Sequence, residues 1–236
     1  MSRSGKKGGL RRLTGRIAIY SLKLLFFLFF ITVVQVSLIR FFNPPFTAMT
    51  AWKFIMEKTV SRQYARQDRY WRDLKDISPN LIRAVLAAED QRFMDHHGFD
   101  FIEMNHAIRD IIQSRRVRGA STITMQVART IFLWPGRSLA RKVLEGYYTI
   151  LIELFWSKTR ILEIYLNFVD WGVGINGAEA ASRKYFKISS DQINTSQAAL
   201  LAAILPSPHK WSPINPDPYV KERQQRIIRD MKNMHL

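Results

Sequence analysis

Glu89 stands at a position where a carboxyl group can do acid–base chemistry. It follows a run of apolar residues, with Ile82, Val85 and Leu86 seven, four and three positions earlier. On a helix its side chain would therefore project from the apolar face. Burial raises the pKa of a carboxyl group, as a general acid or base near neutral pH requires. A salt-bridged glutamate at the surface of a helix end has the same spacing, so periodicity alone leaves both interpretations open.

A segment with the outline of an anion site lies between residues 118 and 126. Arg118, Gly119 and Ala120 precede the hydroxyl residues Ser121 and Thr122, and a helical pattern follows. The free N–H groups and positive dipole end of such a helix favour a phosphate. The segment lacks the Gly-Lys-Ser/Thr of a P-loop. An ordinary capped helix is the alternative.

Two basic residues precede a second carboxylate. Arg141 and Lys142 lie four and three positions before Glu145, so all three share one face of a helix. They could form a basic cradle for a diphosphate, in which Glu145 orients the cations or holds a divalent ion. Surface salt bridges, worth under about 1 kcal/mol each, are the alternative.

The positions of the histidines and the absence of cysteine limit which metal sites and nucleophiles the chain can have. His96 and His97 are adjacent and would face different directions on a helix, and His106, His209 and His235 are scattered. Zinc is therefore not expected, and His96 before the turn residue Gly98 suits a structural role. The chain has no cysteine, which excludes disulfides and thiol nucleophiles.

Helices must position these side chains. Ser78 and Pro79 suit the cap and first position of the helix that carries Glu89. Further helices are expected over 99–114, 121–133, 141–168 with an interruption near 157–158, 177–186, 195–205 and 219–234. The segment 195–205 is rich in Ala and Leu and is expected to fill the core. The sequence shows no alternating strand pattern, so the soluble part is predicted to be mainly α.

An apolar segment precedes the soluble part. Residues 17–39 contain Lys23 as their one charged residue, and as a helix they span about 35 Å, enough for a hydrocarbon core of roughly 30 Å. No A-x-A cleavage pattern follows, so an uncleaved anchor is expected, with a buried core helix as the alternative. The expected parts are a cytoplasmic basic tail (1–16), an anchor (17–39), a linker and membrane-proximal segment (40–77) and a folded domain (78–236).

Composition and charge bound the class of protein. The 236 residues are 47% hydrophobic and 23% charged, which excludes a disordered chain and a polytopic membrane protein. The net charge is +17, and +10 remains after the seven bases of the first 23 residues. A polyanionic neighbour is expected: nucleic acid, anionic lipid or a phosphorylated substrate. Nucleic acid is disfavoured because the bases cluster around acids and the anchor places them outside the cytoplasm.

Four motifs occur in order along the chain. They are Glu89-Asp90-x-x-Phe93-x-x-His96-x-Gly98, Gly119-Ala120-Ser121-Thr122-Ile123-Thr124-x-Gln126, Arg141-Lys142-x-x-Glu145 and Lys158-x-x-Ile161-Leu162-Glu163-x-Tyr165-Leu166-Asn167. In these motifs the sequence resembles the peptidoglycan glycosyltransferases (glycosyltransferase family 51), and most of all their monofunctional biosynthetic members. The resemblance covers residues 70–215 and the anchor.

The resemblance implies a mainly α, lysozyme-like glycosyltransferase domain with a membrane-facing apolar jaw and one N-terminal transmembrane helix. It implies polymerisation of lipid II into β-1,4-linked glycan with inversion and release of undecaprenyl diphosphate. Glu89 matches the general base, and Glu145 matches a second carboxylate near the diphosphate. The residues that match the donor and phosphate site are Ser121, Gln126, Arg129, Arg137 and Lys142, with Thr122 beside them.

The resemblance also implies a setting. The domain is expected in the bacterial periplasm, anchored in the inner membrane, with lipid II and the growing glycan chain as partners and no nucleic acid. Cell-division proteins and other cell-wall synthases are the protein partners that it leaves open. No organic cofactor is expected, and Glu145 is the place for a divalent cation, Mg²⁺ or Mn²⁺.

Three residues depart from the usual motif. Ala120 replaces a glycine, Met125 replaces a glutamine whose amide could bind sugar or phosphate, and Arg129 stands where lysine is common.

Two related activities, transpeptidation and glycan cleavage, are the alternatives. Ser207-x-x-Lys210 matches part of a transpeptidase motif, but no Lys-Thr-Gly follows, so transpeptidation is not expected. A lytic transglycosylase is the alternative, and it has no need of the cradle around Glu145.

Residues 52–56 and 99–112 could dip into a bilayer, since both are amphipathic. Ordinary core packing is the other interpretation of these two segments.

Overall fold

The computed structural model describes residues 4–56, 70–113, 121–136 and 138–234, with side chains described from residue 15 onward except at 53, 54 and 56. The chain divides into two compact units, residues 1–43 and 44–236, and each is described by itself.

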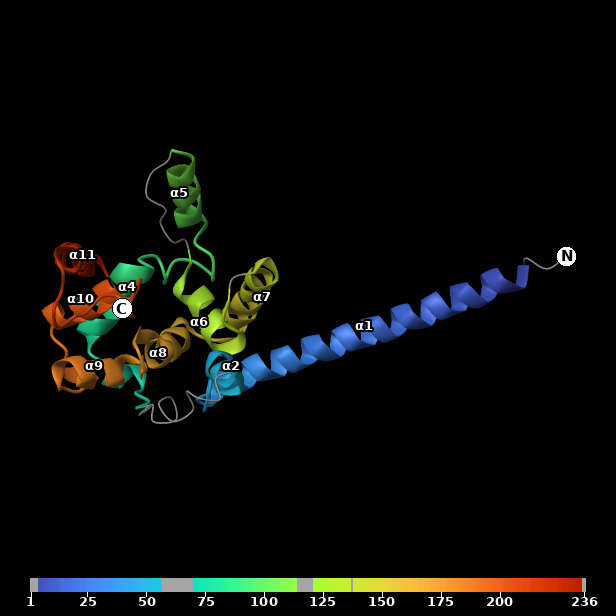
Figure 1. Ribbon diagram of the computed structural model, residues 1–236, viewed down its shortest axis with the longest axis horizontal. Helices are drawn as coiled ribbons and strands as arrows, with labels where there is room; N and C mark the ends of the chain where they lie inside the picture. The colour runs from blue at the N-terminus through green and yellow to red at the C-terminus, as the bar shows by residue number, and fades with distance from the viewer. Residues whose placement is uncertain (1–3, 57–69, 114–120, 137, 235–236) are drawn as a thin grey trace. The chain divides into compact units, whose positions relative to one another are not determined.

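The first unit consists of one long helix, α1 (Ser4–Phe41) (Figure 1). Its part from Gly15 to Phe41 is long and apolar enough to cross a membrane, and its most apolar stretch is not buried by protein. The alternative of a core helix is therefore wrong. The helix begins before the predicted span, at Ser4, and it ends before Pro44 and Pro45.

The second unit is mainly α, as predicted. Its helices are α2 (Ala48–Met56), α4 (Pro79–Glu89), α5 (Phe101–Ile112), α6 (Ile123–Phe132), α7 (Leu139–Phe155), α8 (Lys158–Phe168), α9 (Ala178–Phe186), α10 (Thr195–Ile204) and α11 (Pro218–Asp230). The described residues also form the 3₁₀ turns η1 (Leu74–Asp76), η2 (Ser190–Gln192) and η3 (Met231–Asn233).

A small antiparallel hairpin was not predicted. It pairs β1 (Asp170–Gly172) with β2 (Ile175–Asn176), and Asp170 lies opposite Asn176. Strands of three and two residues are too short to show an alternating pattern.

Side-chain caps fix where the site-bearing helices begin. Ser78 accepts a hydrogen bond from the N–H of Asn80, and Pro79 occupies the first position of α4. Thr122 and Ser138 accept from the N–H groups three residues later, at the starts of α6 and α7. These contacts satisfy N–H groups that a helix leaves unpaired, and they set the register of the residues that follow.

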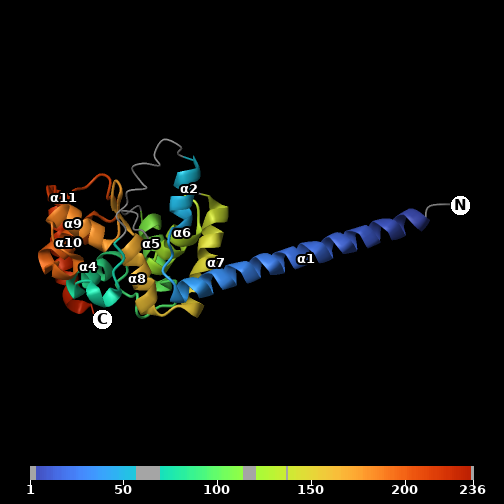
Figure 2. The ribbon, with the colours of Figure 1, turned by 90° about the horizontal axis from the view of Figure 1, so that it is seen from below.

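The core has α10 at its centre, as the Ala- and Leu-rich segment predicts. Ala198, Ala199 and residues 201–204 are buried, and α10 packs against α4 and α11. A second group is formed by α6 with α7 and α8. The two groups lie on opposite sides of the second unit (Figures 1 and 2).

Helix α5 does not pack its apolar face into the core. Phe101 is 72% exposed and Ile112 is 76% exposed, and Ala107 is the buried residue of this helix. Figure 1 shows α5 projecting from the body of the unit. The core-packing interpretation of residues 99–112 is therefore wrong.

Candidate active site

Glu89 is the last residue of α4 and is largely withdrawn from solvent. Its side chain is 16% exposed, and it follows the buried Ile82, Val85 and Leu86. Oε2 accepts a hydrogen bond of 3.0 Å from Nε2 of Gln126 in α6. Oε1 lies 3.7 Å from Nη2 of Arg223 in α11. The carboxylate thus sits at a helix end, held from two other helices.

This environment changes the acidity of Glu89. Burial raises the pKa of the Glu89 carboxyl group, and the charge of Asp90 adds to that effect. The hydrogen bond from Gln126 and the charges of Arg223 and Arg129 oppose it. The net direction is upward, toward the range in which a carboxylate accepts a proton efficiently near neutral pH.

Tyr165 extends the contact made by Gln126. Its hydroxyl lies 3.5 Å from Oε1 of Gln126, and burial raises the pKa of Tyr165 well above its usual value. The phenol therefore stays neutral and orients the Gln126 amide, whose N–H faces Glu89.

Asp90 fastens the end of α4 to the start of α6. Its Oδ2 accepts from the N–H of Ile123 at 2.9 Å, and its Oδ1 lies 2.9 Å from Nε2 of the buried His96. His96 thus takes the structural place expected of it. Because Gln126 lies in the first turn of α6, this contact sets Gln126 opposite Glu89.

Asp90, His96 and Asp100 bring potential ligand atoms within 4.8 Å of one another. However, Asp90 already receives the N–H of Ile123, and Arg92 Nε lies 3.4 Å from Asp100 Oδ2. We interpret this cluster as an internal polar network that joins Asp90, His96, Asp100 and Arg92.

Gly98 is required by its surroundings. Its φ is +86°, and a Cβ there would lie 2.7 Å from Cγ2 of Thr149 in α7. A side chain at this position would force the loop away from α7.

The residues of the predicted anion segment, 118–126, have different roles. The Thr122 hydroxyl is buried, caps α6 and donates to the carbonyl of Gly98 at 2.7 Å, so it serves as an ordinary cap. Ser121 is half-buried. Gly119 and Ala120 lie outside the described residues.

Met125 is buried, with 6% exposed. The side chain at this unusual position therefore packs inside the fold, and the neighbouring Gln126 supplies the amide that reaches Glu89.

Glu145 is surrounded by cations. It is buried in α7, with Oε2 2.8 Å from Arg141 Nη1 and Oε1 2.5 Å from Lys142 Nζ. Arg141 is also buried, whereas the Lys142 side chain is 45% exposed. The alternative of exposed surface salt bridges is therefore wrong for this cluster. The buried Glu145 carboxylate aligns Arg141 and Lys142, and the exposed Lys142 can contact an anion. Arg137 lies outside the described residues.

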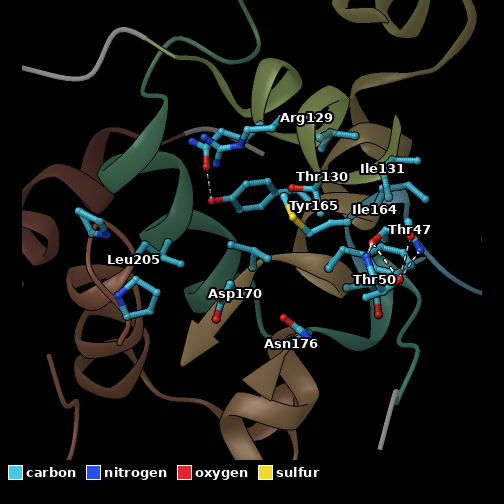
Figure 3. Close-up of a pocket in the computed structure, with 18 of the residues that line it drawn as sticks. Thr47, Thr50, Arg129, Thr130, Ile131, Ile164, Tyr165, Asp170, Asn176 and Leu205 are labelled. Atoms are coloured by element: carbon cyan, nitrogen blue, oxygen red, sulfur yellow. Dashed lines mark hydrogen bonds between the residues drawn. The ribbon is translucent and has the colours of Figure 1, made fainter. Parts of the chain in front are cut away.

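Gln126, which donates to Glu89, also lines a cavity of about 370 Å³. Arg129, Thr130 and Tyr165 line one end of it, and Thr47 and Thr50 lie at one side (Figure 3). Gln126, Asp170, Asn176 and His209 also contribute to its wall. Its size and mixed polar and apolar lining suit a sugar unit.

Sequence reasoning missed several residues of this cavity. Asp170 and His209 are joined by a 2.8 Å contact between Oδ2 and Nε2, yet they are 39 positions apart. Thr47 and Thr50 precede the domain boundary expected from the sequence. The Asp170–His209 pair leaves no local pattern, because folding alone brings these two residues together.

Comparisons with known proteins show which family this chain resembles over most of its length. The family described as "Transglycosylase" matches residues 56–232. A protein named biosynthetic peptidoglycan transglycosylase from Caulobacter vibrioides is 45% identical over 195 residues, which are 83% of this chain and 82% of the relative. Proteins of the same name from Ectopseudomonas mendocina and Shewanella oneidensis are 44% and 41% identical, over 95% and 93% of this chain and 91% and 93% of the relatives.

Proposed function

Because the chain belongs to the transglycosylase family, we propose that Glu89 is the general base of a glycosyl transfer that builds peptidoglycan. The protein is a peptidoglycan glycosyltransferase with a lysozyme-like, mainly α domain, and it polymerises glycan strands. The lytic alternative is not favoured, since the matched relatives are named biosynthetic.

The proposed step needs one base and one stabilised leaving group. Glu89 takes the proton of the GlcNAc 4-hydroxyl of lipid II, and that oxygen attacks the anomeric carbon of the growing chain's terminal MurNAc. The α-linked bond to undecaprenyl diphosphate breaks, the diphosphate leaves with the electron pair, and a β-1,4 bond forms with inversion. Gln126 supports this role because it holds one carboxylate oxygen of Glu89 at 3.0 Å and itself lines the cavity.

The leaving group requires positive charge. Lys142 keeps an exposed ammonium group beside the buried Glu145, and Arg129 adds an exposed guanidinium near Glu89. We assign these cations to the diphosphate, whose negative charge grows as the bond breaks. The roles of Ser121 and Arg137 stay predictions.

The surroundings of Glu145 do not suit a divalent cation. Both carboxylate oxygens already contact cations, at 2.8 Å and 2.5 Å, so a metal ion there would have to displace Lys142. The residues in this arrangement therefore do not fit a divalent ion.

The membrane setting is proposed from two surfaces. The apolar part of α1 is long enough to anchor the chain in the bacterial inner membrane, with the basic tail cytoplasmic and the domain periplasmic. Exposed apolar residues on α5 would bring the domain to the lipid-borne substrate. Recruitment by cell-division proteins or other cell-wall synthases stays a prediction.

The observation that carries the function is a half-buried carboxylate with a raised pKa, held by an amide beside a sugar-sized cavity. The test supplies the full-length protein in detergent with labelled lipid II, and separately with preformed glycan. We expect polymer from lipid II and no cleavage of glycan. Cleavage without polymer would instead establish the lytic activity.

A further inference from the structure

Helix α11 places a cation beside Glu89 from the far end of the chain. Arg223 Nη2 lies 3.7 Å from Glu89 Oε1 and donates to the main-chain carbonyl of Ala88 at 3.3 Å. The Arg223 side chain is 20% exposed. One guanidinium nitrogen therefore contacts both the last turn of α4 and the carboxylate that ends it.

The contact is built into the fold. Helix α11 packs against α4 and α10, and Asp217 caps its start by accepting from the N–H of Val220 at 2.7 Å. The buried Nε of Arg223 has no hydrogen-bond partner among the described residues. The guanidinium is thus held in place by its Nη2 contacts and by packing.

Side chains from two other helices contact the two carboxylate oxygens of Glu89. Gln126 from α6 binds Oε2, and Arg223 from α11 faces Oε1. Asp90 beside it interacts unfavourably with a charged Glu89, whereas Arg129 and Arg223 favour it. Of the two cations, Arg129 is exposed to solvent and Arg223 is mostly buried, so the charge of Arg223 is less screened.

We infer that Arg223 is a positioning residue for Glu89: it clamps the end of α4 and one carboxylate oxygen, and its charge favours the ionised form that accepts a proton. This inference rests on the proposed role of Glu89. It requires that the last helix of the domain take part in catalysis through α4, although Arg223 belongs to none of the four motifs.

The test compares pH profiles of kcat/KM for lipid II polymerisation by the full-length protein in detergent. For Arg223→Gln we expect the acidic limb to move to higher pH by about one unit, with about tenfold lower kcat/KM below the limb. Arg223→Lys keeps the charge and should leave the limb near its wild-type position. Because an ammonium lacks the planar fork, it should lower kcat about threefold or more.

Arg226→Gln is the matched control. It removes the same charge from the same helix, but Arg226 is 59% exposed and pairs with Glu222 at 3.1 Å. The acidic limb of the kcat/KM profile of Arg226→Gln should stay at its wild-type pH. An unshifted limb in Arg223→Gln, or an equal shift in Arg226→Gln, would overturn the inference.

Two further measurements keep the outcomes distinct. Thermal melting reports whether each variant folds. If Arg223→Gln does not fold, Arg223→Lys tests the positioning role instead. A folded Arg223→Lys variant with wild-type kcat would refute that role. Glu89→Gln in the same assay separates the two assignments: activity in Glu89→Gln refutes the general base, whereas an inactive Glu89→Gln with an unshifted Arg223→Gln refutes Arg223 alone.

Discussion

Glu89 and Glu145 are both carboxylates near cations, yet their surroundings suit opposite tasks. Glu89 accepts an amide hydrogen bond at 3.0 Å and, among the described residues, faces the cation Arg223 at 3.7 Å. Glu145 is buried between two bases at 2.8 Å and 2.5 Å. A weakly paired carboxylate can still take a proton, whereas one saturated by cations serves to hold them in place.

The pH dependence of polymerisation follows from Glu89. Burial raises the pKa of its carboxyl group, and a base must be ionised, so activity is lost as the pH falls through this raised value. We expect the acidic limb of kcat/KM above the ordinary glutamate value of about 4.3. Initial rates with labelled lipid II over a range of pH measure it. A limb at the ordinary value would contradict the effect of burial.

Part of this site could be predicted from residue spacing, and part could not. The apolar neighbours of Glu89 and the shared face of Arg141, Lys142 and Glu145 follow from helical periodicity, since they depend on residues within two turns. Arg223 contacts Ala88 from 135 positions away, and no local pattern records such a contact.

At the scale of elements, a buried carboxylate ties α9 to two distant segments. Glu179 has no exposed side-chain area and pairs with Arg72 at 3.0 Å and Arg183 at 2.6 Å. It also accepts from the N–H of Ser190 in η2 at 2.8 Å. Burial opposes its ionisation, but the Arg72, Ser190 and Arg183 contacts outweigh burial and lower the pKa of Glu179 to about 2.

Glu179→Gln should therefore destabilise the domain at neutral pH by about 3 kcal/mol. Because the folded pKa lies below the unfolded one, the stabilisation is complete above about pH 4.5 and is lost as the pH falls toward 2. Urea unfolding at pH 7 and at lower pH measures both effects. The matched control is Glu222→Gln, since Glu222 is 72% exposed in its pair with Arg226 and should change stability little. Equal effects of the two variants would contradict the account.

The elements were predicted best where local chemistry fixes them. Ser78 and Pro79 predict the start of α4, because a helix cap depends on adjacent residues. The apolar composition of residues 195–205 likewise predicts a core helix. The exposure of α5 was not decided by its sequence, since an amphipathic pattern is the same against protein and against lipid. The hairpin of β1 and β2 is too short to carry a pattern.

At the scale of the whole molecule, apolar surface is displayed on the domain as well as on the anchor. Phe101, Ile108 and Ile112 of α5 are each more than half exposed, as are Val143 and Leu154 of α7. Exposed apolar faces on a chain with net charge +17 suit contact with an anionic lipid surface.

Residues 44–236 form a compact unit, and we expect this unit to bind anionic vesicles without the anchor. Ile108→Asn with Ile112→Asn should weaken binding severalfold, because the two side chains are 53% and 76% exposed and would lose their burial in lipid. Vesicle co-sedimentation measures this. The control is Asn105→Ser on the same helix, which should bind as the parent does. Absence of vesicle binding by residues 44–236 would contradict a membrane-facing α5.

The most direct test of the account compares wild type with Glu89→Gln in lipid II polymerisation, with thermal melting of both proteins. Loss of the base should lower the rate by about 10²–10⁴-fold. The fold should be retained or slightly more stable, because the raised pKa means that the charged carboxylate opposes folding at neutral pH. A folded Glu89→Gln variant that polymerises lipid II at the wild-type rate would contradict the central claim.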